Sequence, residues 1–390
     1  RMTLVLRERF IGAKIIRAFD NSKKERDKFN DVAQEYTDNY IIINKKFALL
    51  SPMAFALMSV VITLIIFFGA MKVLNNTLEI GSITAIVEYS LTTIAALIMS
   101  SMVLVQMPKA VVSIERIEEV LNVTSEIKDK EELKDNSYYE NILKQNPISL
   151  TFDNVCFRYK GAEKQILKNI SFSVKAGERF AIVGVTGSGK STIAKVLLRL
   201  NDIESGRILI NGVDALDLPL NCLRNQISYT PQKAYIFSGK IKDNFRFTNK
   251  NMTDKEMIKI AKIAQSYDFI DSLPDKFDSF VAQGGINFSG GQKQRLSIAR
   301  ALSKDANIYL FDDSFSALDY ATDAKLRKEL KTFLKDKITI IIAQRLNTIA
   351  DADKIIVLKD SEIIGMGTHQ ELLESNQEYI ELAKSQGILE

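Results

Sequence analysis

Hydrophobic and polar positions divide the chain into three regions with different patterns. Residues 1–46 are rich in charge, and apolar side chains such as Phe10, Ile11 and Ile15 recur at helical spacing in the stretch RERFIGAKIIRAF. From Phe47 to Met71 no charged residue occurs, and a helix over this stretch would rise roughly 37 Å. Because a bilayer core is about 30 Å thick, the pattern predicts a membrane span rather than a buried helix of a soluble protein.

A second apolar stretch follows a short polar loop. It runs from Ile83 to Met107, contains one charged residue, Glu88, and ends before Pro108. We predict a second span over these residues, continued by residues 109–122 as a helical extension. Glu88 then lies either near the outer end of the span, where it reaches the interface, or against a water-filled cavity.

The positions of basic residues predict the orientation of both spans. Lys45, Lys46 and the basic stretch before them outweigh Lys72, the single basic residue of the short loop. Because positively charged flanks favour the cytoplasmic side, we expect the loop to face outward and both outer flanks to lie in the cytoplasm. The sequence therefore predicts a multi-pass protein of the cell membrane.

From Ile148 onward, short predicted strands and helices alternate to the end of the chain. A helical membrane segment, with two transmembrane helices and long cytoplasmic extensions, is thus expected to precede an α/β domain with a helical subdomain around Leu220 to Arg300. The predicted boundaries are 1–122 for the C-terminal part of a transmembrane domain, 123–147 for a polar linker and 148–390 for the α/β domain.

Composition narrows the possible functions. The net charge of +4 is small beside 52 basic and 48 acidic residues, which argues against a nucleic-acid partner. The two cysteines, Cys156 and Cys222, lie in neither a CxxC motif nor a Cys/His cluster, so neither a zinc site nor a disulfide framework is expected. His369 is the single histidine of the chain.

The strongest chemical signal is the stretch RFAIVGVTGSGKSTIAKVLLRL. Phe180 to Val183 predicts a buried strand and Thr192 to Leu200 a helix, and the loop between them matches GxxxxGK[ST], the P-loop pattern, in its proper context. The residues predicted to bind a nucleotide here are Gly184, Val185, Thr186, Gly187, Ser188, Gly189, Lys190, Ser191 and Thr192.

Physical chemistry explains this choice of residues. Glycines let the backbone turn its N–H groups toward phosphate oxygens, and the following helix adds the positive end of its dipole. Lys190 is expected to reach the β- and γ-phosphates of ATP, and the Ser191 hydroxyl to bind Mg²⁺. A second predicted strand, NIYLF, ends at Asp312, whose carboxylate is expected beside Ser191 on the metal ion.

Several further motifs resemble those of ABC exporters. FSGGQKQRLSIARAL, from Phe288 to Leu302, resembles the signature motif of ABC transporter ATPase domains. YTPQKAYIFSGKIKDNF is similar to the Q-loop segment of ABC exporters, and SALD to their D-loop. The two apolar stretches resemble the fifth and sixth membrane helices of an exporter half. The resemblance thus covers essentially the whole chain and implies four further membrane helices that this sequence lacks.

The resemblance also implies roles at matching positions. Tyr159 in VCFRYKG would stack on adenine, and Gln232 would contact Mg²⁺ and couple the ATP site to the membrane helices. The signature would complete the ATP site of an opposing subunit, because glycines lead into a helix whose N-terminus can face a γ-phosphate. The signature residues are Ser289, Gly290, Gly291 and Gln292.

Two positions depart from the family pattern. Exporters that hydrolyse ATP normally have a glutamate after the first acid, where this chain has Asp313. The two acids have nearly equal intrinsic pKa values, so the difference is reach, and a misplacement of about an ångström can cost on the order of 10²-fold in rate. The family's switch histidine is replaced by Gln344 in IIAQR, and an amide cannot donate to the γ-phosphate as a cation.

Together these departures resemble the subunit of a heterodimeric multidrug exporter that carries a degenerate ATP site. The resemblance implies a second half-transporter as partner, ATP and Mg²⁺ as ligands, a small amphipathic substrate, and a cytoplasmic ATPase domain at a bacterial plasma membrane. The sequence leaves open a homodimer that tolerates both changes, a lipid or peptide exporter, and a regulatory ATP-binding subunit. The two spans oppose a soluble P-loop kinase or repair ATPase.

Overall fold

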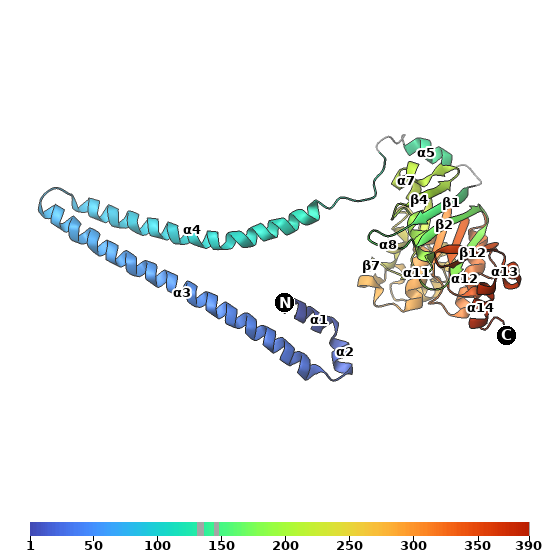
Figure 1. Cartoon of the computed structure of the whole chain (residues 1–390), viewed down its shortest axis with the longest axis horizontal. Helices are drawn as coiled ribbons and strands as arrows, with labels where there is room; N and C mark the ends of the chain where they lie inside the picture. Colours follow the sequence, from blue (N-terminus) through green and yellow to red (C-terminus); the bar gives the residue numbers. More distant parts are fainter. Residues whose placement is uncertain (131–135, 144–147, 390) are drawn as a thin grey trace. The chain divides into compact units, whose positions relative to one another are not determined.

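The computed structural model describes residues 1–130, 136–143 and 148–389 (Figure 1). Its internal contacts divide the chain into two compact units, Arg1–Thr124 and Ser125–Glu390.

The first unit consists of helices. Figure 1 shows two long helices, α3 and α4, joined by a short turn, with α1 and α2 at the N-terminal end. α1 and α4 both pack against α3. Close approach of the two long helices is possible because Gly69 leaves room for the side chain of Ile83, which would lie 2.9 Å from a Cβ at that position. The helices are α1 (Met2–Ile11), α2 (Ala13–Ala18), α3 (Ser22–Leu74) and α4 (Ile80–Leu121).

Both predicted membrane spans are found as helices. Pro52–Leu74 and Ile80–Ser100 are long and apolar enough to cross a bilayer, with mean hydropathies of 2.5 and 1.6. Pro52 and Pro108 lie inside helices rather than at their ends. A proline removes one backbone hydrogen bond, and the helix continues across it in both cases. As expected, the second helix extends well beyond its apolar part, to Leu121.

The second unit is an α/β domain built around a six-stranded sheet with the strand order β12-β11-β3-β10-β9-β6. The five strands from β11 to β6 are parallel, and β12 pairs antiparallel at the edge. A four-stranded antiparallel sheet, β2-β1-β4-β5, and the small pair β7-β8 complete it. The strands are β1 (Ser149–Phe157), β2 (Leu167–Lys175), β3 (Arg179–Gly184), β4 (Ser205–Ile210), β5 (Val213–Asp214), β6 (Ile227–Thr230), β7 (Gly239–Lys240), β8 (Phe280–Val281), β9 (Ile308–Asp312), β10 (Ile338–Ile342), β11 (Lys354–Lys359) and β12 (Glu362–Gly367).

Helices cover this unit, and the segment from α7 to α11 is the helical subdomain expected around Leu220 to Arg300. The α-helices are α5 (Asn136–Leu143), α6 (Lys190–Leu197), α7 (Leu220–Asn225), α8 (Ile241–Arg246), α9 (Asp254–Ile263), α10 (Tyr267–Asp271), α11 (Gly290–Leu302), α12 (Tyr320–Phe333), α13 (His369–Ser375) and α14 (Gln377–Ser385). Short 3-10 turns are η1 (Ala215–Asp217), η2 (Lys276–Asp278), η3 (Gln283–Gly285) and η4 (Leu346–Thr348).

The central strands of the parallel sheet are buried on both faces. Along β10, Ile340 packs into one hydrophobic cluster and Ile341 into the other, and β9 alternates in the same way with Leu310 and Phe311. Such uninterrupted apolar runs are typical of parallel strands covered on two sides. One cluster includes the antiparallel sheet, α6 and α7, and the other includes α8 to α11 and the C-terminal helices.

The described part of the polar linker predicted over 123–147 has more structure than its composition suggests, and residues 131–135 and 144–147 lie outside the described residues. Residues from Ser125 belong to the second unit, and α5 lies within the predicted linker. Tyr139 and Leu143 stand one helical turn apart and are both buried in the core cluster that contains α6. This apolar pair explains why α5 packs against the domain despite its polar neighbours.

Candidate nucleotide site

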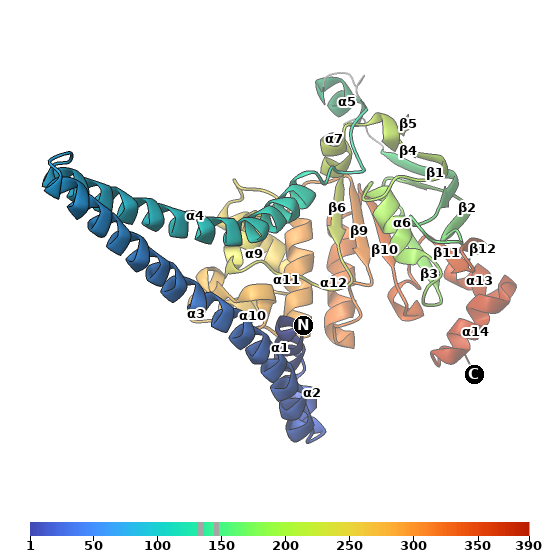
Figure 2. The ribbon, with the colours of Figure 1, turned by 60° about the vertical axis from the view of Figure 1, so that its left-hand side comes forward.

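Four neighbouring parallel strands end at one edge of the six-stranded sheet, and a predicted site residue follows each of them. The P-loop follows β3, Asp313 follows β9, Gln344 follows β10, and Gln232 follows β6. Figure 2 shows these strands together with α6, which packs against β3 and β9. In open α/β sheets the crevice at the carboxyl ends of the strands is where ligands bind.

The P-loop takes a shape that only glycine permits at two positions. Gly184 has φ 156° and a Cβ there would lie 2.1 Å from the Leu358 carbonyl oxygen. Gly189 has φ 101° and a Cβ there would lie 2.6 Å from the Ile166 carbonyl oxygen. Both contacts are closer than a Cβ atom tolerates, so the backbone of this loop requires glycine at both positions. The turn at Gly189 then leads directly into α6 at Lys190.

Polar side chains inside the loop fit a phosphate group. The Lys190 ammonium donates to the carbonyl oxygens of Gly184 and Val185, each at 2.7 Å. Burial lowers the pKa of Lys190, while the nearby carboxylates of Asp312 and Asp313 oppose that shift. The buried Ser188 hydroxyl has no hydrogen-bond partner among the described residues. An unpaired buried hydroxyl beside a cation and a helix N-terminus is suited to an anionic ligand.

The structure brings the predicted metal-binding acid to the P-loop. Asp312 is 3% exposed, and its Oδ1 accepts a hydrogen bond of 2.9 Å from the Ser191 hydroxyl. Burial raises the pKa of Asp312, and the hydrogen bonds from Ser191 and Tyr229 oppose that shift. A hydroxyl and a carboxylate oxygen side by side fit Mg²⁺, which prefers hard oxygen ligands and binds through one or two protein groups while keeping several waters.

The second acid is held by two amides. The Oδ2 of Asp313 accepts a hydrogen bond of 3.0 Å from the Gln232 side chain and one of 3.3 Å from the Gln344 side chain. The backbone of Asp313 has φ 46°, and its N–H donates to the Ile342 carbonyl at 2.8 Å. Side chains from the ends of β6, β9 and β10 thus meet at one carboxylate oxygen.

Tyr159 lies beside the P-loop helix. Its hydroxyl is 3.3 Å from the Thr192 hydroxyl and accepts a hydrogen bond of 3.2 Å from Lys195. The Lys195 ammonium also lies 5.4 Å from the centre of the tyrosine ring. The half-buried ring packs edge-on against Phe157, with centroids 4.8 Å apart. Adenine stacking by Tyr159 remains a prediction.

The predicted signature residues form the start of α11. The Ser289 hydroxyl accepts from the Gln292 backbone N–H at 3.2 Å, and the Gln292 side chain accepts from the Ser289 N–H at 2.9 Å. This capping box fixes the helix N-terminus, and Ser289 and Gly290 are exposed there. α11 packs against β6, α8 and α9, and no hydrogen bond between described residues joins this motif to the P-loop.

Two contributors to the site were not predicted from the sequence. The Tyr229 hydroxyl donates to the Oδ2 of Asp312 at 3.3 Å, and the Gln386 side chain donates to the Gln344 carbonyl at 2.8 Å. Tyr229 lies on β6 just before Gln232, so its position near the carboxyl end of the sheet was a usable signal. Gln386 follows α14, far along the chain, and nothing local indicates its contact.

Two family descriptions match this chain. The description "ABC transporter" matches residues 167–316, and "ABC transporter transmembrane region" matches residues 1–97. The first match contains the P-loop, Gln232, the signature and both acids.

Curated relatives and a solved structure match over nearly the whole chain. An ATP-dependent lipid A-core flippase of Desulfotalea psychrophila is 34% identical over 96% of this chain and 64% of its own length. A putative multidrug export ATP-binding/permease protein of Bacillus subtilis is 33% identical over 98% of this chain and 65% of its own length. A bacterial Atm1-family ABC exporter with ATP bound superposes with a TM-score of 0.83 at 30% identity, covering 98% of this chain and 65% of that one. The chain thus spans about two thirds or less of the length of these proteins.

Proposed function

Because this chain belongs to the ABC transporters, with a transmembrane region followed by an ATPase domain of the exporter type, we propose that it is part of an ATP-driven exporter. It works as one of two subunits, with a partner half-transporter opposite it. The cargo is a drug or another small amphipathic compound. The protein lies in the cell membrane, with the ATPase domain in the cytoplasm.

In this proposal each residue at the end of the parallel sheet has a defined task. The backbone N–H groups of the P-loop and the Lys190 ammonium bind the ATP phosphates, and the Tyr159 ring faces the adenine. Ser191 and Asp312 hold Mg²⁺, which neutralises charge that develops on the phosphate oxygens. Residues 289–292 complete the ATP site of the partner subunit.

One observation carries the finer part of the proposal, which is that this chain's own ATP site turns over slowly. The Oδ2 of Asp313 is already hydrogen-bonded to the amides of Gln232 and Gln344. The aspartate is one methylene shorter than a glutamate, so its carboxylate reaches less far toward a water molecule beside the γ-phosphate. A shortfall of about an ångström costs on the order of 10²-fold in rate.

The amide of Gln344 adds to this effect. A histidine at the end of β10 could donate to the γ-phosphate as a cation, whereas the neutral Gln344 amide donates to Asp313 instead. ATP therefore binds at this site and persists, while a partner with a glutamate and a histidine supplies rapid hydrolysis. The arrangement makes the exporter a heterodimer with two unequal ATP sites.

A second cargo class has its own support. One relative that is 34% identical over 96% of this chain is named as a lipid A-core flippase, so a lipid is the alternative to a drug. The two cargo classes differ in their effect on ATP hydrolysis by the complete exporter in nanodiscs. A drug exporter responds to added cationic amphipathic compounds at fixed lipid composition. A lipid exporter responds to the lipid composition instead.

The proposal predicts weak ATP hydrolysis by this subunit alone. The full-length subunit, purified without a partner, should bind ATP but hydrolyse it on the order of 10²-fold more slowly than the co-purified pair. A coupled-enzyme assay of phosphate release measures both rates in the same detergent or nanodisc. Equal rates per ATP site in the two preparations would contradict the slow-site proposal.

A further inference from the structure

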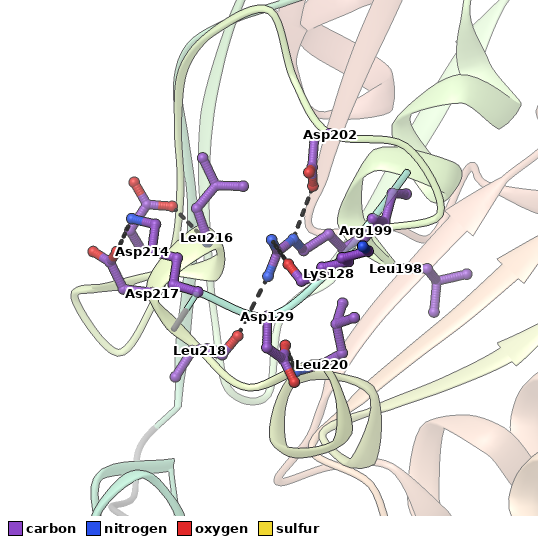
Figure 3. A network of polar contacts seen from close by, with 12 residues as sticks. Lys128, Asp129, Leu198, Arg199, Asp202, Asp214, Leu216, Asp217, Leu218 and Leu220 are labelled. Carbon is purple, nitrogen blue, oxygen red and sulfur yellow. Dashed lines mark hydrogen bonds and ion pairs between the residues drawn. The ribbon is translucent and has the colours of Figure 1, made fainter. Parts of the chain in front are cut away.

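The segment that enters the second unit is fastened to the end of the P-loop helix. We call residues 125–130 the tether. Only residues 122–124 separate it from the end of α4 at Leu121. The tether is mostly exposed, yet three consecutive residues of it, Lys128, Asp129 and Lys130, contact the α/β domain (Figure 3).

The central contact is made by a buried arginine. Arg199 is 4% exposed and lies just after α6 with φ 47°. Its guanidinium donates to the Lys128 carbonyl of the tether at 3.0 Å and to the Asp202 carboxylate at 2.8 Å. A third donor reaches the Leu218 carbonyl at 3.4 Å. Figure 3 shows the guanidinium between these three partners, which come from separate parts of the chain.

Two further tether contacts flank this arginine. The Asp129 carboxylate accepts the backbone N–H of Leu220, the first residue of α7, at 2.8 Å. Lys130 forms an ion pair with Asp217. The Leu220 amide proton is therefore a direct reporter of whether the tether is docked.

α6 connects the tether contact to the nucleotide site. The helix begins at Lys190 and ends at Leu197, which makes it about 12 Å long. Six of its residues are buried, so the helix is packed along its length. At its far end Arg224 donates to the carbonyls of Leu198 and Arg199, which holds the C-terminal turn in place. A rigid element therefore has the P-loop at one end and the tether clamp at the other.

We propose that Arg199 is a positioning residue that couples the tether to the P-loop helix, so that nucleotide binding at one end of α6 and tether docking at the other stabilise each other. Such coupling is reciprocal, because each event must change the affinity of the other by the same factor. It gives α4 a route to the ATP site that runs along the covalent chain. The inference requires a nucleotide site at the P-loop but not a slow one.

Hydrogen–deuterium exchange tests this coupling directly in the complete transporter in nanodiscs. In the unmodified protein, the nonhydrolysable analogue AMP-PNP with Mg²⁺ should slow exchange at the Leu220 amide. In Arg199→Gln, exchange at this amide should be roughly tenfold faster, the loss expected for one charge-assisted hydrogen bond, and should no longer respond to AMP-PNP. The P-loop peptides should still gain protection from the analogue.

Two other variants make the outcome decisive. Arg207 is an exposed arginine on β4 that pairs with Asp153 of β1 at 2.8 Å. Arg207→Gln should leave the exchange rate of the Leu220 amide and its response to AMP-PNP unchanged. Asp129→Ala changes only an exposed tether residue, so it avoids the folding risk of a buried arginine. By reciprocity it should weaken AMP-PNP binding, measured by calorimetry, by roughly two- to tenfold.

The results that overturn the inference are equally specific. A merely structural clamp would keep the Leu220 amide equally protected with and without AMP-PNP in the unmodified protein. It would also leave the AMP-PNP affinity of Asp129→Ala unchanged. Because AMP-PNP is not hydrolysed, either result would leave the slow-site proposal intact, and rapid hydrolysis by the isolated subunit would leave the coupling intact.

Discussion

At the scale of single residues, the central feature is the Asp313 carboxylate, which is hydrogen-bonded to two neighbouring side chains. Asp313 accepts from Gln232 and Gln344 at the same oxygen. Both donors are neutral amides, which can orient the carboxylate but can supply no positive charge to a phosphate. Residue size and residue charge therefore act in the same direction at this site.

Restoring the family residues should raise hydrolysis at this site. In a pair whose partner subunit carries a glutamine in place of its catalytic glutamate, Asp313→Glu combined with Gln344→His should increase ATP hydrolysis about 10- to 100-fold. The longer carboxylate reaches the attacking water, and the imidazole faces the γ-phosphate. Steady-state phosphate release measures the change.

The matched control separates the carboxylate from the imidazole. Asp313→Asn with Gln344→His keeps the length of the native side chain but removes its charge, and it should show no increase. If the Glu/His pair also produced none, reach and charge at these two positions would not limit the site.

Tyr229 should affect magnesium rather than folding. Its hydroxyl donates to the Oδ2 of Asp312, and Ser191 donates to the other oxygen of this carboxylate. Tyr229→Phe removes the hydrogen bond to Oδ2, so the carboxylate is held in place less firmly. We expect the apparent affinity for Mg²⁺ at saturating ATP to fall roughly two- to tenfold, as for the loss of one hydrogen bond. Titration of Mg²⁺ against bound fluorescent ATP measures it.

Tyr309→Phe provides the comparison for this prediction. Tyr309 lies on β9, and its hydroxyl donates to the Lys304 carbonyl at 2.6 Å rather than to Asp312. Its loss should lower the thermal unfolding temperature while leaving the Mg²⁺ affinity unchanged. Equal Mg²⁺ affinities in both variants would mean that the Tyr229 hydroxyl does not position Asp312.

At the scale of elements, the sequence predicted those helices, strands and loops whose structure depends on neighbouring residues in the chain. The strand, glycine loop and helix around Lys190 were expected at nearly their observed bounds, because the apolar run and the glycines each have a local cause. The two apolar stretches were likewise expected as helices, although α3 and α4 run through Pro52 and Pro108. A long uninterrupted apolar stretch therefore indicates a helix more strongly than a single proline argues against one.

Contacts between distant segments could not be predicted in this way. The strand order of the six-stranded sheet, the packing of α5 through Leu143, and the clamp of Arg199 on Lys128 all depend on which surfaces meet. The sequence around Arg199 contains only an arginine after a helix, which in isolation indicates a favourable charge near a C-terminus. Its burial and its three acceptors become visible only in the folded domain.

The shape of the P-loop makes a stability prediction. Gly189→Ala should destabilise the domain by about 1–3 kcal/mol, because it combines a positive φ with a backbone contact of 2.6 Å. Denaturant unfolding measures the loss. Gly290→Ala meets no atom within 4 Å and lies at a helix start, so its effect should stay within about 0.5 kcal/mol. Similar losses for the two variants would contradict the steric account.

At the scale of the whole molecule, we propose that the two subunits of the exporter differ in their ATP sites. This chain places the Lys190 ammonium inside the P-loop and the Ser191 hydroxyl beside the Asp312 carboxylate, and the capped N-terminus of α11 is exposed. It lacks a long carboxylate and a histidine where the sheet ends. The combination suits a subunit that binds ATP durably at its own P-loop and serves rapid hydrolysis at the other site.

Vanadate trapping tests this asymmetry most directly. In the co-purified pair, ATP hydrolysis in the presence of vanadate traps the nucleotide at the site that has completed a turnover, and an α-phosphate-labelled 8-azido-ATP then marks the subunit that holds it. We expect ultraviolet light to label the partner subunit strongly and this chain on the order of 10²-fold less. Equal vanadate-dependent labelling of both subunits, or labelling of this chain in a complex of two identical copies, would contradict it.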